Sequence, residues 1–296
     1  MTGAVVLDKH EGITSFWAAA QLRRIFGEKK IGHTGTLDPM ASGVLPVLLG
    51  GATKFVSLLP SHDKAYRATF LLGAETDTLD ITGTVLRQRY VNAGETDVLR
   101  VLQGYRGKIR QVPPMYSAVS RDGVRLYELA RQGVEVEREA RDVEIYSLEL
   151  VRSDALKGEY TIDVRCSAGT YIRSLVSDVG RDLGCGAVLT ALRRTQANGI
   201  FEADAHTLDA LRACSEEERR QLVLPVDRLL LAYPAVFVTE KQSVRFGHGG
   251  ELFADRVRGL SENGLYRVYD PNKKFLGLGE RRDDVLAVRR RLMDED

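Results

Sequence analysis

The sequence predicts an α+β fold, with a large domain on a mixed, mostly antiparallel sheet and a small β-rich C-terminal domain. The chain has 296 residues, of which 44% are hydrophobic and 28% charged, which suits one large and one small globular domain. Strand-like and helix-like segments alternate irregularly, unlike the strict βαβ order of a parallel sheet. After Tyr233-Pro234 only short apolar strands follow. We therefore expect domains at residues 1–232 and 235–296.

The N-terminal part predicts a strand at residues 5–7 and then a helix. Thr14 or Ser15 can cap this helix, and Gly27 can end it. Its apolar side chains follow the spacing i, i+4, i+7, i+8 of one helical face: Ala18, Leu22, Ile25 and Phe26.

The remaining elements follow from apolar runs and alternation. Buried or half-buried strands are expected at residues 44–49, 64–72 and 161–166, and helices at residues 97–104, 124–132 and 171–183. In the C-terminal domain, strands are expected at residues 236–238, 264–269 and 275–279, with a turn at residues 270–272.

Charge is distributed unevenly along a chain whose net charge is only +1. Residues 105–133 hold six Lys or Arg against two acids and include Tyr105, Tyr116 and Tyr127. Residues 241–291 hold twelve Lys or Arg against seven acids and end in a run of three arginines. A solvated surface would explain either region alone, but two basic regions in a near-neutral chain favour a polyanionic partner.

Several function classes have little support. No stretch approaches the roughly 20 apolar residues of a membrane span, and the N-terminus lacks the features of a signal peptide, so we expect a cytoplasmic protein that binds no membrane. Three cysteines without C-x-x-C spacing suggest neither a disulfide framework nor a zinc site, and the five histidines have no metal-ligand spacing. Asp80-Ile81-Thr82-Gly83 is interpreted as a turn joining two strands, because an aspartic protease would need a second such carboxylate.

The segment IGHTGTLDPMASG at residues 31–43 places a lone carboxylate, Asp38, in a Gly- and Thr-rich loop before an apolar strand. An Asp before Pro in such a loop is usually a turn former. However, residues 32–45 resemble, without a gap, the catalytic motif of the tRNA pseudouridine synthase B (TruB) family. Residues 64–66, 169–175 and 192–195 resemble its other active-site segments, with Ala65 as a mild departure.

The resemblance implies that uridine at position 55 in the T loop of transfer RNA is isomerised to pseudouridine. The C1′–N1 bond is cut, the base turns, and C5 is joined to C1′, which needs no metal and no cofactor. Asp38 is implied as the catalytic group, either as a nucleophile or as the base that removes a sugar proton. Arg173 is our candidate for the partner that keeps Asp38 ionised.

The resemblance also implies how a flipped base is held. Tyr66 would stack on the uracil, Tyr171 would lie beside it, and Leu192 would line the pocket, whereas core packing would otherwise explain both tyrosines. His33 would fill the space that the base leaves or hold a rearranged nucleotide.

Residues 105–133 resemble the family's RNA-gripping insertion, and residues 235–296 resemble a PUA domain. We expect a monomer that binds the T arm of transfer RNA without a guide RNA. Two alternatives remain open: an RNA-binding or RNA-folding protein without chemistry, and a glycosidase or glycosylase that hydrolyses the bond. A paired carboxylic acid, which the latter typically requires, is not identifiable.

Overall fold

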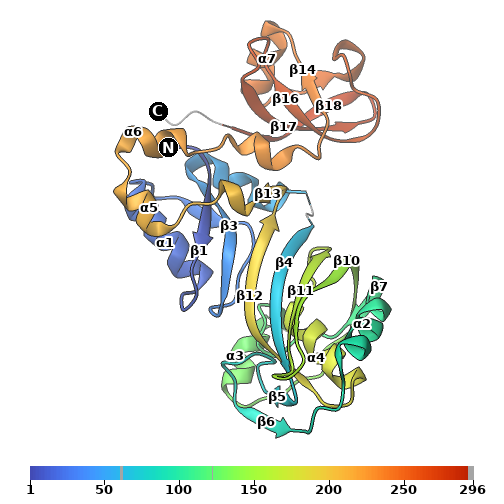
Figure 1. The fold of residues 1–296 in the computed structure, drawn as a ribbon. Helices are drawn as coiled ribbons and strands as arrows, with labels where there is room; N and C mark the ends of the chain where they lie inside the picture. Colours follow the sequence, from blue (N-terminus) through green and yellow to red (C-terminus); the bar gives the residue numbers. More distant parts are fainter. Residues whose placement is uncertain (61–62, 122, 293–296) are drawn as a thin grey trace.

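The computed structural model describes residues 1–60, 63–121 and 123–292, and it contains a long sheet and a separate smaller one (Figure 1). His62, Asp122, residues 293–296 and the side chain of Arg121, all used in the sequence predictions, lie outside the described residues. Within the described residues the large sheet has nine strands: β1 (Gly3–Lys9), β2 (Ile31–His33), β3 (Ala41–Leu49), β4 (Lys64–Leu72), β7 (Gly107–Gln111), β10 (Arg141–Asp154), β11 (Glu159–Cys166), β12 (Ala187–Ala197) and β13 (Ile200–Phe201).

The strand order of the large sheet is β1-β3-β12-β4-β11-β10-β7, with β2 paired to β3 and β13 paired to β12. Paired strands run antiparallel except β3 and β12, which are parallel. This parallel pair brings the segment after Asp38 beside residues 192–194, which are about 150 positions away in the sequence. The predicted α+β class with a mostly antiparallel sheet is confirmed.

Strand β4 lies in the middle of the sheet, between β12 and β11. Its side chains alternate, so that Tyr66, Ala68 and Phe70 are buried on one face while Arg67 is exposed on the other. β4 spans the predicted residues 64–72, and β3 and β11 begin a few residues before the predicted positions.

Seven α-helices lie within the described residues: α1 (Ser15–Ile25), α2 (Glu95–Gly104), α3 (Leu126–Arg131), α4 (Ile172–Asp182), α5 (Leu208–Ala213), α6 (Glu216–Gln221) and α7 (Glu240–Gly247). Thr14 caps α1 by accepting a hydrogen bond from the Trp17 N–H, as the sequence predicts. None of these helices has the length and apolar character needed to cross a bilayer.

The predicted helix over residues 124–132 begins later in the structure, at Leu126. The residues before it form β9 (Val124–Arg125), which pairs with β8 (Ser120–Arg121) as a short hairpin. A second small hairpin is made by β5 (Ala74–Thr76) and β6 (Val85–Gln88). The predicted turn at residues 80–83 lies between these two strands.

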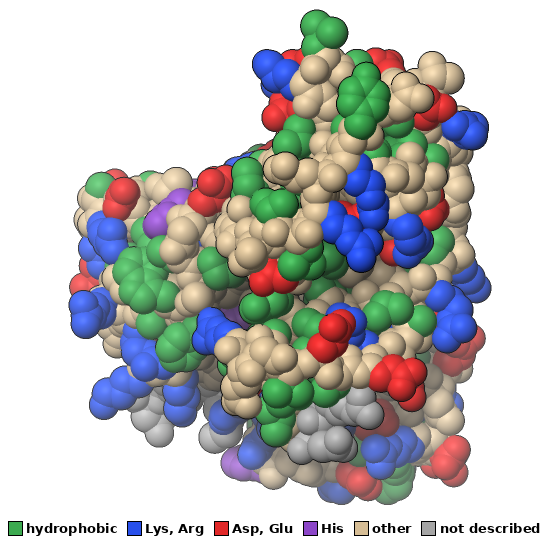
Figure 2. Space-filling view, turned by 90° about the horizontal axis from the view of Figure 1, so that it is seen from below, with side chains coloured by type: hydrophobic (Ala, Val, Ile, Leu, Met, Phe, Trp, Pro, Cys, Tyr) green, Lys and Arg blue, Asp and Glu red, His purple; other side chains and the backbone are tan. Residues whose placement is uncertain are grey.

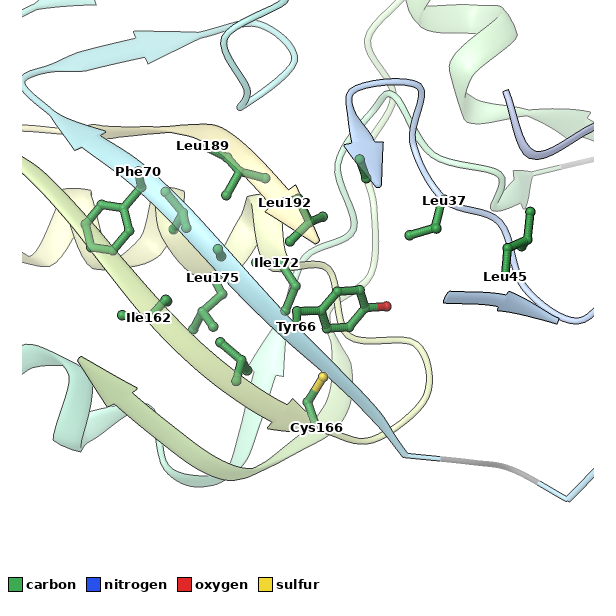
Figure 3. Close-up of a cluster of buried hydrophobic side chains, with 14 of the residues drawn as sticks. Leu37, Leu45, Tyr66, Phe70, Ile162, Cys166, Ile172, Leu175, Leu189 and Leu192 are labelled. Atoms are coloured by element: carbon green, nitrogen blue, oxygen red, sulfur yellow. The ribbon is translucent and has the colours of Figure 1, made fainter. Parts of the chain in front are cut away.

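Helix α4 packs against the buried face of the large sheet. Ile172, Leu175, Val176 and Val179 belong to the same core cluster as the inward side chains of β4, β11 and β12. Figure 3 shows this packing, with Ile172 and Leu192 close to the ring of Tyr66 and with Leu37 on its far side.

The C-terminal sheet has the order β14-β16-β17-β18-β15. Its strands are β14 (Ala235–Phe237), β15 (Leu252–Phe253), β16 (Gly264–Tyr269), β17 (Phe275–Arg282) and β18 (Val285–Arg291). This sheet shares a hydrophobic cluster with the rest of the chain, because Tyr269, Phe275 and Leu278 pack with Phe55 of the 3₁₀ segment η1 (Gly50–Leu58) and with Leu229 of η3 (Val226–Leu230). The remaining 3₁₀ segments are η2 (Glu202–Asp204) and η4 (Ala254–Arg256).

Candidate active site

Asp38 lies in the loop between β2 and β3, and buried side chains hold this loop. The Leu37 N–H donates to the Ser15 Oγ at 2.7 Å, and the Ser15 hydroxyl donates back to the Leu37 carbonyl at 3.1 Å. The fully buried Lys9 amine donates to the carbonyls of Ile13 at 2.9 Å and Pro39 at 3.4 Å. These contacts fix the backbone on both sides of Asp38, so its carboxylate is carried by a rigid loop.

Arg194 of β12 holds the first part of the same loop. It is fully buried, and its guanidinium donates to the carbonyls of Val44 at 2.7 Å, Thr36 at 3.4 Å and Gly35 at 3.3 Å. Each of its nitrogens therefore has a backbone carbonyl as partner, which offsets the cost of burying the charge.

Gly43 lets β3 approach β12 closely enough for this arrangement. It pairs with Arg194 and has a φ of +103°, and a Cβ atom at this position would lie 2.2 Å from the Arg194 carbonyl oxygen. Only glycine fits a position that combines this backbone angle with such close contact.

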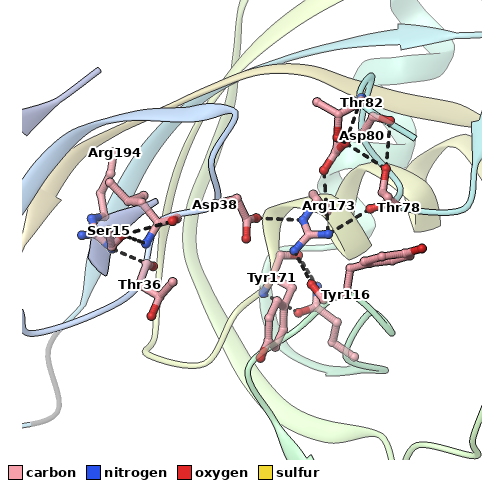
Figure 4. A network of polar contacts seen from close by, with 12 residues as sticks. Ser15, Thr36, Asp38, Thr78, Asp80, Thr82, Tyr116, Tyr171, Arg173 and Arg194 are labelled. Atoms are coloured by element: carbon pink, nitrogen blue, oxygen red, sulfur yellow. Dashed lines mark hydrogen bonds and ion pairs between the residues drawn. The ribbon is translucent and has the colours of Figure 1, made fainter. Parts of the chain in front are cut away.

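Arg173 of α4 forms the predicted ion pair with Asp38, with 2.8 Å between its Nε and the Asp38 Oδ2 (Figure 4). Its side chain is 4% exposed, and it also donates to the carbonyls of Thr78 at 2.9 Å and Tyr116 at 2.8 Å. These three contacts come from separate segments of the chain and fix the guanidinium plane against the Asp38 carboxylate.

Asp80 is a second carboxylate beside Arg173, with 3.8 Å between its Oδ2 and the Arg173 Nη1. Its Oδ1 accepts hydrogen bonds from the Thr78 hydroxyl at 2.8 Å and from the Thr82 N–H at 3.0 Å. The residues 80–83 thus form the predicted turn and also bring a buried charge to the far side of the guanidinium (Figure 4). The second role was not predicted from the sequence.

Burial raises the pKa of the Asp38 carboxyl above its usual value, and the Asp80 charge raises it further. The Arg173 and Lys9 charges oppose this rise. The Asp38 carboxylate therefore has a higher affinity for a proton than an exposed aspartate has. Its cationic neighbours limit this effect because they favour the ionised form.

A pocket of about 210 Å³ opens in front of Asp38. Its described lining residues are Thr36, Leu37, Asp38, Lys64, Tyr66, Ser117, Ala118, Gly169, Thr170, Tyr171, Ile172, Arg173 and Leu192. Asp38 is the one carboxylate among them, and the aromatic and aliphatic side chains of Tyr66, Ile172 and Leu192 form an apolar wall. Such a wall beside a few charged groups suits a flat, weakly polar ring.

Tyr66 presents its ring to this pocket from the centre of β4. The side chain is 7% exposed, and burial raises the pKa of its hydroxyl to about 12 although the nearby Arg194 charge lowers it. The hydroxyl is therefore protonated at neutral pH and can donate a hydrogen bond.

Tyr171 stands immediately before α4, where Gln111 of β7 holds its backbone. The Tyr171 N–H donates to the Gln111 Oε1 at 2.7 Å, and the Gln111 Nε2 donates to the Tyr171 carbonyl at 3.0 Å. Gln111 is 2% exposed, so this clamp is buried. It fixes the start of the helix that carries Arg173.

His33 ends β2, opposite Val47, and is not among the described residues that line the pocket. Burial and the Arg194 charge lower the pKa of its ring, and its Nδ1 is buried without a hydrogen-bond partner among the described residues. Of the six predicted site residues, the structure thus brings five to one pocket, and His33 is outside the described lining of that pocket. Their roles toward a substrate remain predictions.

Sequence reasoning missed Lys9, Ser15, Asp80 and Gln111. Each of these residues either contacts a segment that is distant in the sequence or holds a loop in place. The spacing of residues within one segment therefore does not indicate their role. No group of three or more His, Cys, Asp or Glu residues that could hold a metal is found in residues 1–60, 63–121 and 123–292.

Three family models match the chain in succession. The model described as TruB family pseudouridylate synthase (N terminal domain) matches residues 23–172, tRNA pseudouridylate synthase B C-terminal domain matches residues 173–231, and Pseudouridine synthase II TruB, C-terminal matches residues 234–292. The chain belongs to the TruB family of pseudouridylate synthases.

Full-length relatives carry the same family name. The tRNA pseudouridine synthase B of Clostridium perfringens (strain SM101 / Type A) is 42% identical over 298 residues, which cover 100% of both chains. That of Burkholderia mallei (strain NCTC 10247) is 46% identical over 293 residues, which cover 98% of this chain and 96% of the relative. This chain is accordingly an isomerase that converts uridine to pseudouridine in transfer RNA, as the resemblance in the sequence predicts.

Solved structures share the fold. A chain of the crystal structure of a Cbf5-Nop10-Gar1 complex matches with a TM-score of 0.77 and 26% identity over 98% of this chain and 85% of that chain. A chain of the structure of an H/ACA RNP bound to a substrate RNA containing 2'-deoxyuridine matches with a TM-score of 0.75 and 25% identity, over 99% and 86% of the two chains. The likeness includes the C-terminal β-rich domain.

Proposed function

We propose that Asp38 is the catalytic residue and that the uridine converted is position 55 in the T loop of transfer RNA. The observation that supports this most directly is the Asp38 carboxylate, held at 2.8 Å by Arg173 and placed beside the apolar wall of Tyr66, Ile172 and Leu192 in the pocket. Isomerisation of uridine needs one ionised carboxylate near C1′ and a surface for the detached base, and this pocket offers both.

The proposed sequence of events conserves every atom of the RNA. The uridine is turned out of its stack into the pocket, where Tyr66 and Leu192 face the ring and Tyr171 lies beside it. The C1′–N1 bond breaks, the base rotates within the pocket, C5 bonds to C1′, and the proton from C5 is transferred to N1. Asp38 acts either by attack on C1′ or by removing a sugar proton, and in both schemes it must be ionised.

The RNA outside the pocket is proposed to be gripped by two regions. Residues 105–133 carry the basic insertion next to the pocket, and residues 235–296 form a PUA-like domain beyond residues 1–232, which hold the chemistry. The face that Figure 2 shows from below is hollowed, with Lys and Arg side chains on both sides of the hollow. We place the protein in the cytoplasm with its substrate, as a monomer that needs no guide RNA.

The test is to incubate the protein with unmodified transfer RNA and to map pseudouridine along the product. We expect a single new pseudouridine at position 55 and an unchanged RNA mass. Transfer RNA with cytidine at position 55 serves as the control and should remain unmodified. Pseudouridine at another position would contradict the T-loop assignment, and loss of a base would indicate a glycosylase.

A further inference from the structure

Lys64 is a cation in the Asp38 pocket for which the proposed chemistry gives no role. It begins β4, and the strand's alternation places its side chain on the same face as Tyr66. Both side chains line the pocket. A Cβ atom built on Gly35 would lie 3.7 Å from the Lys64 Nζ, so the amine lies beside the loop that carries Asp38.

The Lys64 amine has no counter-charge among the described residues. The preceding carboxylate, Asp63, pairs with Arg165 instead, at 3.2 Å. The Arg194 Nη1 also lies 3.7 Å from the Cβ position built on Gly35. The nitrogens of Arg194, however, all donate to backbone carbonyls. Burial and the Arg194 charge lower the pKa of Lys64, and Cys166 raises it. No carboxylate is among these influences. Two neighbouring cations without an acid make this edge of the pocket attractive to an anion.

The position along β4 indicates which part of a nucleotide meets this amine. Lys64 is partly exposed at the start of the strand, Tyr66 is 7% exposed, and Ala68 and Phe70 are fully buried. The pocket therefore deepens from Lys64 towards Tyr66. A flipped nucleotide enters with its base first, and its phosphate stays near the opening.

We propose that Lys64 binds the backbone phosphate of the flipped uridine at the rim of the Asp38 pocket. The inference rests on the proposed function of this pocket and adds a binding residue to it. A lysine amine suits this task because it is a compact point charge with three donors. The contact anchors the nucleotide while Tyr66 holds the base deeper in the pocket.

The test is a double-mutant cycle between Lys64 and one phosphate. T-arm RNA is prepared with a single uncharged methylphosphonate linkage on the 5′ or the 3′ side of the target uridine. Binding is measured with Asp38→Asn protein, to prevent turnover, with and without Lys64→Met. We expect Lys64→Met to weaken binding about tenfold, and to lower the salt slope by about 0.7.

The deciding result is how the two changes combine. One of the two neutral linkages should weaken binding about tenfold with Lys64 present and have no further effect once Lys64→Met is introduced. If the two effects multiply at both linkages, or if Lys64→Met leaves affinity unchanged, the proposal is wrong.

Two controls separate this contact from general charge and folding. Lys157→Met removes an exposed lysine that pairs with Asp154 at 3.0 Å and should keep the full phosphate sensitivity. Lys64→Arg keeps the charge and should keep the sensitivity to the same linkage, which tests the proposal even if Lys64→Met folds poorly; loss of that sensitivity would contradict it. Pseudouridine mapping tests the proposed function separately. If the effects of the neutral linkage and of Lys64→Met on binding multiply while pseudouridine still forms at position 55, only the proposed role of Lys64 is wrong.

Discussion

Asp38 is subject to two opposing influences on its charge. Burial and Asp80 raise the pKa of its carboxyl, while the Arg173 guanidinium at 2.8 Å lowers it. A carboxyl whose pKa is raised takes up a proton at a higher pH than an ordinary aspartate, whose pKa is about 3.9. If the ionised form is required, the rate should fall on the acid side at a correspondingly higher pH.

Asp80→Asn tests this balance. The asparagine keeps an oxygen for the Thr78 and Thr82 donors and removes the charge 3.8 Å from Arg173. The pKa of Asp38 should therefore fall, and the acid limb of the single-turnover rate should move to lower pH. Asp163→Asn, which removes an exposed carboxylate paired with Arg67, should leave the limb in place. A limb that moves to higher pH would contradict the electrostatic account.

Tyr66 allows stacking and hydroxyl chemistry to be separated. Tyr66→Phe keeps the ring face and should bind RNA within about twofold of wild type, whereas Tyr66→Ala should lose roughly 1–3 kcal/mol of stacking. The single-turnover rate of Tyr66→Phe then reports the hydroxyl alone, whose pKa is raised to about 12. If Tyr66→Phe weakens binding as much as Tyr66→Ala, the stacking role is wrong.

At the scale of the elements, the parallel pair of β3 and β12 supports the Asp38 loop. Gly43→Ala would place a Cβ atom 2.2 Å from the Arg194 carbonyl oxygen at a φ of +103°. We expect it to lower the free energy of unfolding by about 2–4 kcal/mol and to displace the Asp38 loop. Denaturant unfolding and the turnover rate measure the two effects.

Gly249→Ala is the matched control for this prediction. Gly249 has a φ of +87°, but nothing lies within 4 Å of the position of its missing Cβ atom. Its substitution should therefore cost only about 1 kcal/mol, from backbone strain. Equal destabilisation of the two variants would show that close contact at Gly43 does not matter.

Elements with strong local patterns were predictable from the sequence. The alternation in β4 and the spacing and Thr14 cap of α1 are local, and the structure has both. Strand β12 was not predicted, because the buried Arg194 interrupts its apolar pattern and is accommodated by carbonyls from the distant Asp38 loop. Patterns within a segment cannot indicate such contacts.

The site divides in the same way. The resemblance at residues 32–45 indicated Asp38, and the resemblance at residues 169–175 indicated Arg173 as the cation that keeps it ionised. The supports of the site, namely Ser15, Asp80 and Gln111, are defined only by packing against partners that lie 22 to 93 positions away in the sequence. A sequence met alone gives no reason to choose them over other polar residues.

At the scale of the molecule, the C-terminal sheet is joined to the rest by a shared core. The ring centres of Phe275 and Phe55 are 5.9 Å apart, and the Tyr269 hydroxyl donates to the Asp227 carboxylate at 2.7 Å. Deleting residues 235–296 would expose this cluster, so loss of activity after deletion would not isolate an RNA-binding role. Substitutions of exposed charges are the better test.

Two pairs of exposed arginines can be compared in this way. Arg125→Ala with Arg131→Ala should weaken the binding of both transfer RNA and isolated T-arm RNA. Arg289→Ala with Arg290→Ala should weaken the binding of transfer RNA more than the binding of isolated T-arm RNA, which is too short to reach the C-terminal domain. Removing one interaction between an arginine and a phosphate should reduce the slope of log affinity against log salt concentration by about 0.7 to 0.9. Unchanged affinities and slopes for both pairs would identify these charges as solvated surface.

The central claim, that the Asp38 carboxylate performs the isomerisation, is tested most directly by the single-turnover rate of Asp38→Asn on saturating unmodified transfer RNA. The substitution keeps the shape of the side chain and removes its negative charge. We predict RNA affinity within a few-fold of wild type and a rate of pseudouridine formation at position 55 that falls by roughly a thousandfold or more. A rate within tenfold of wild type, with folding and binding intact, would contradict the account.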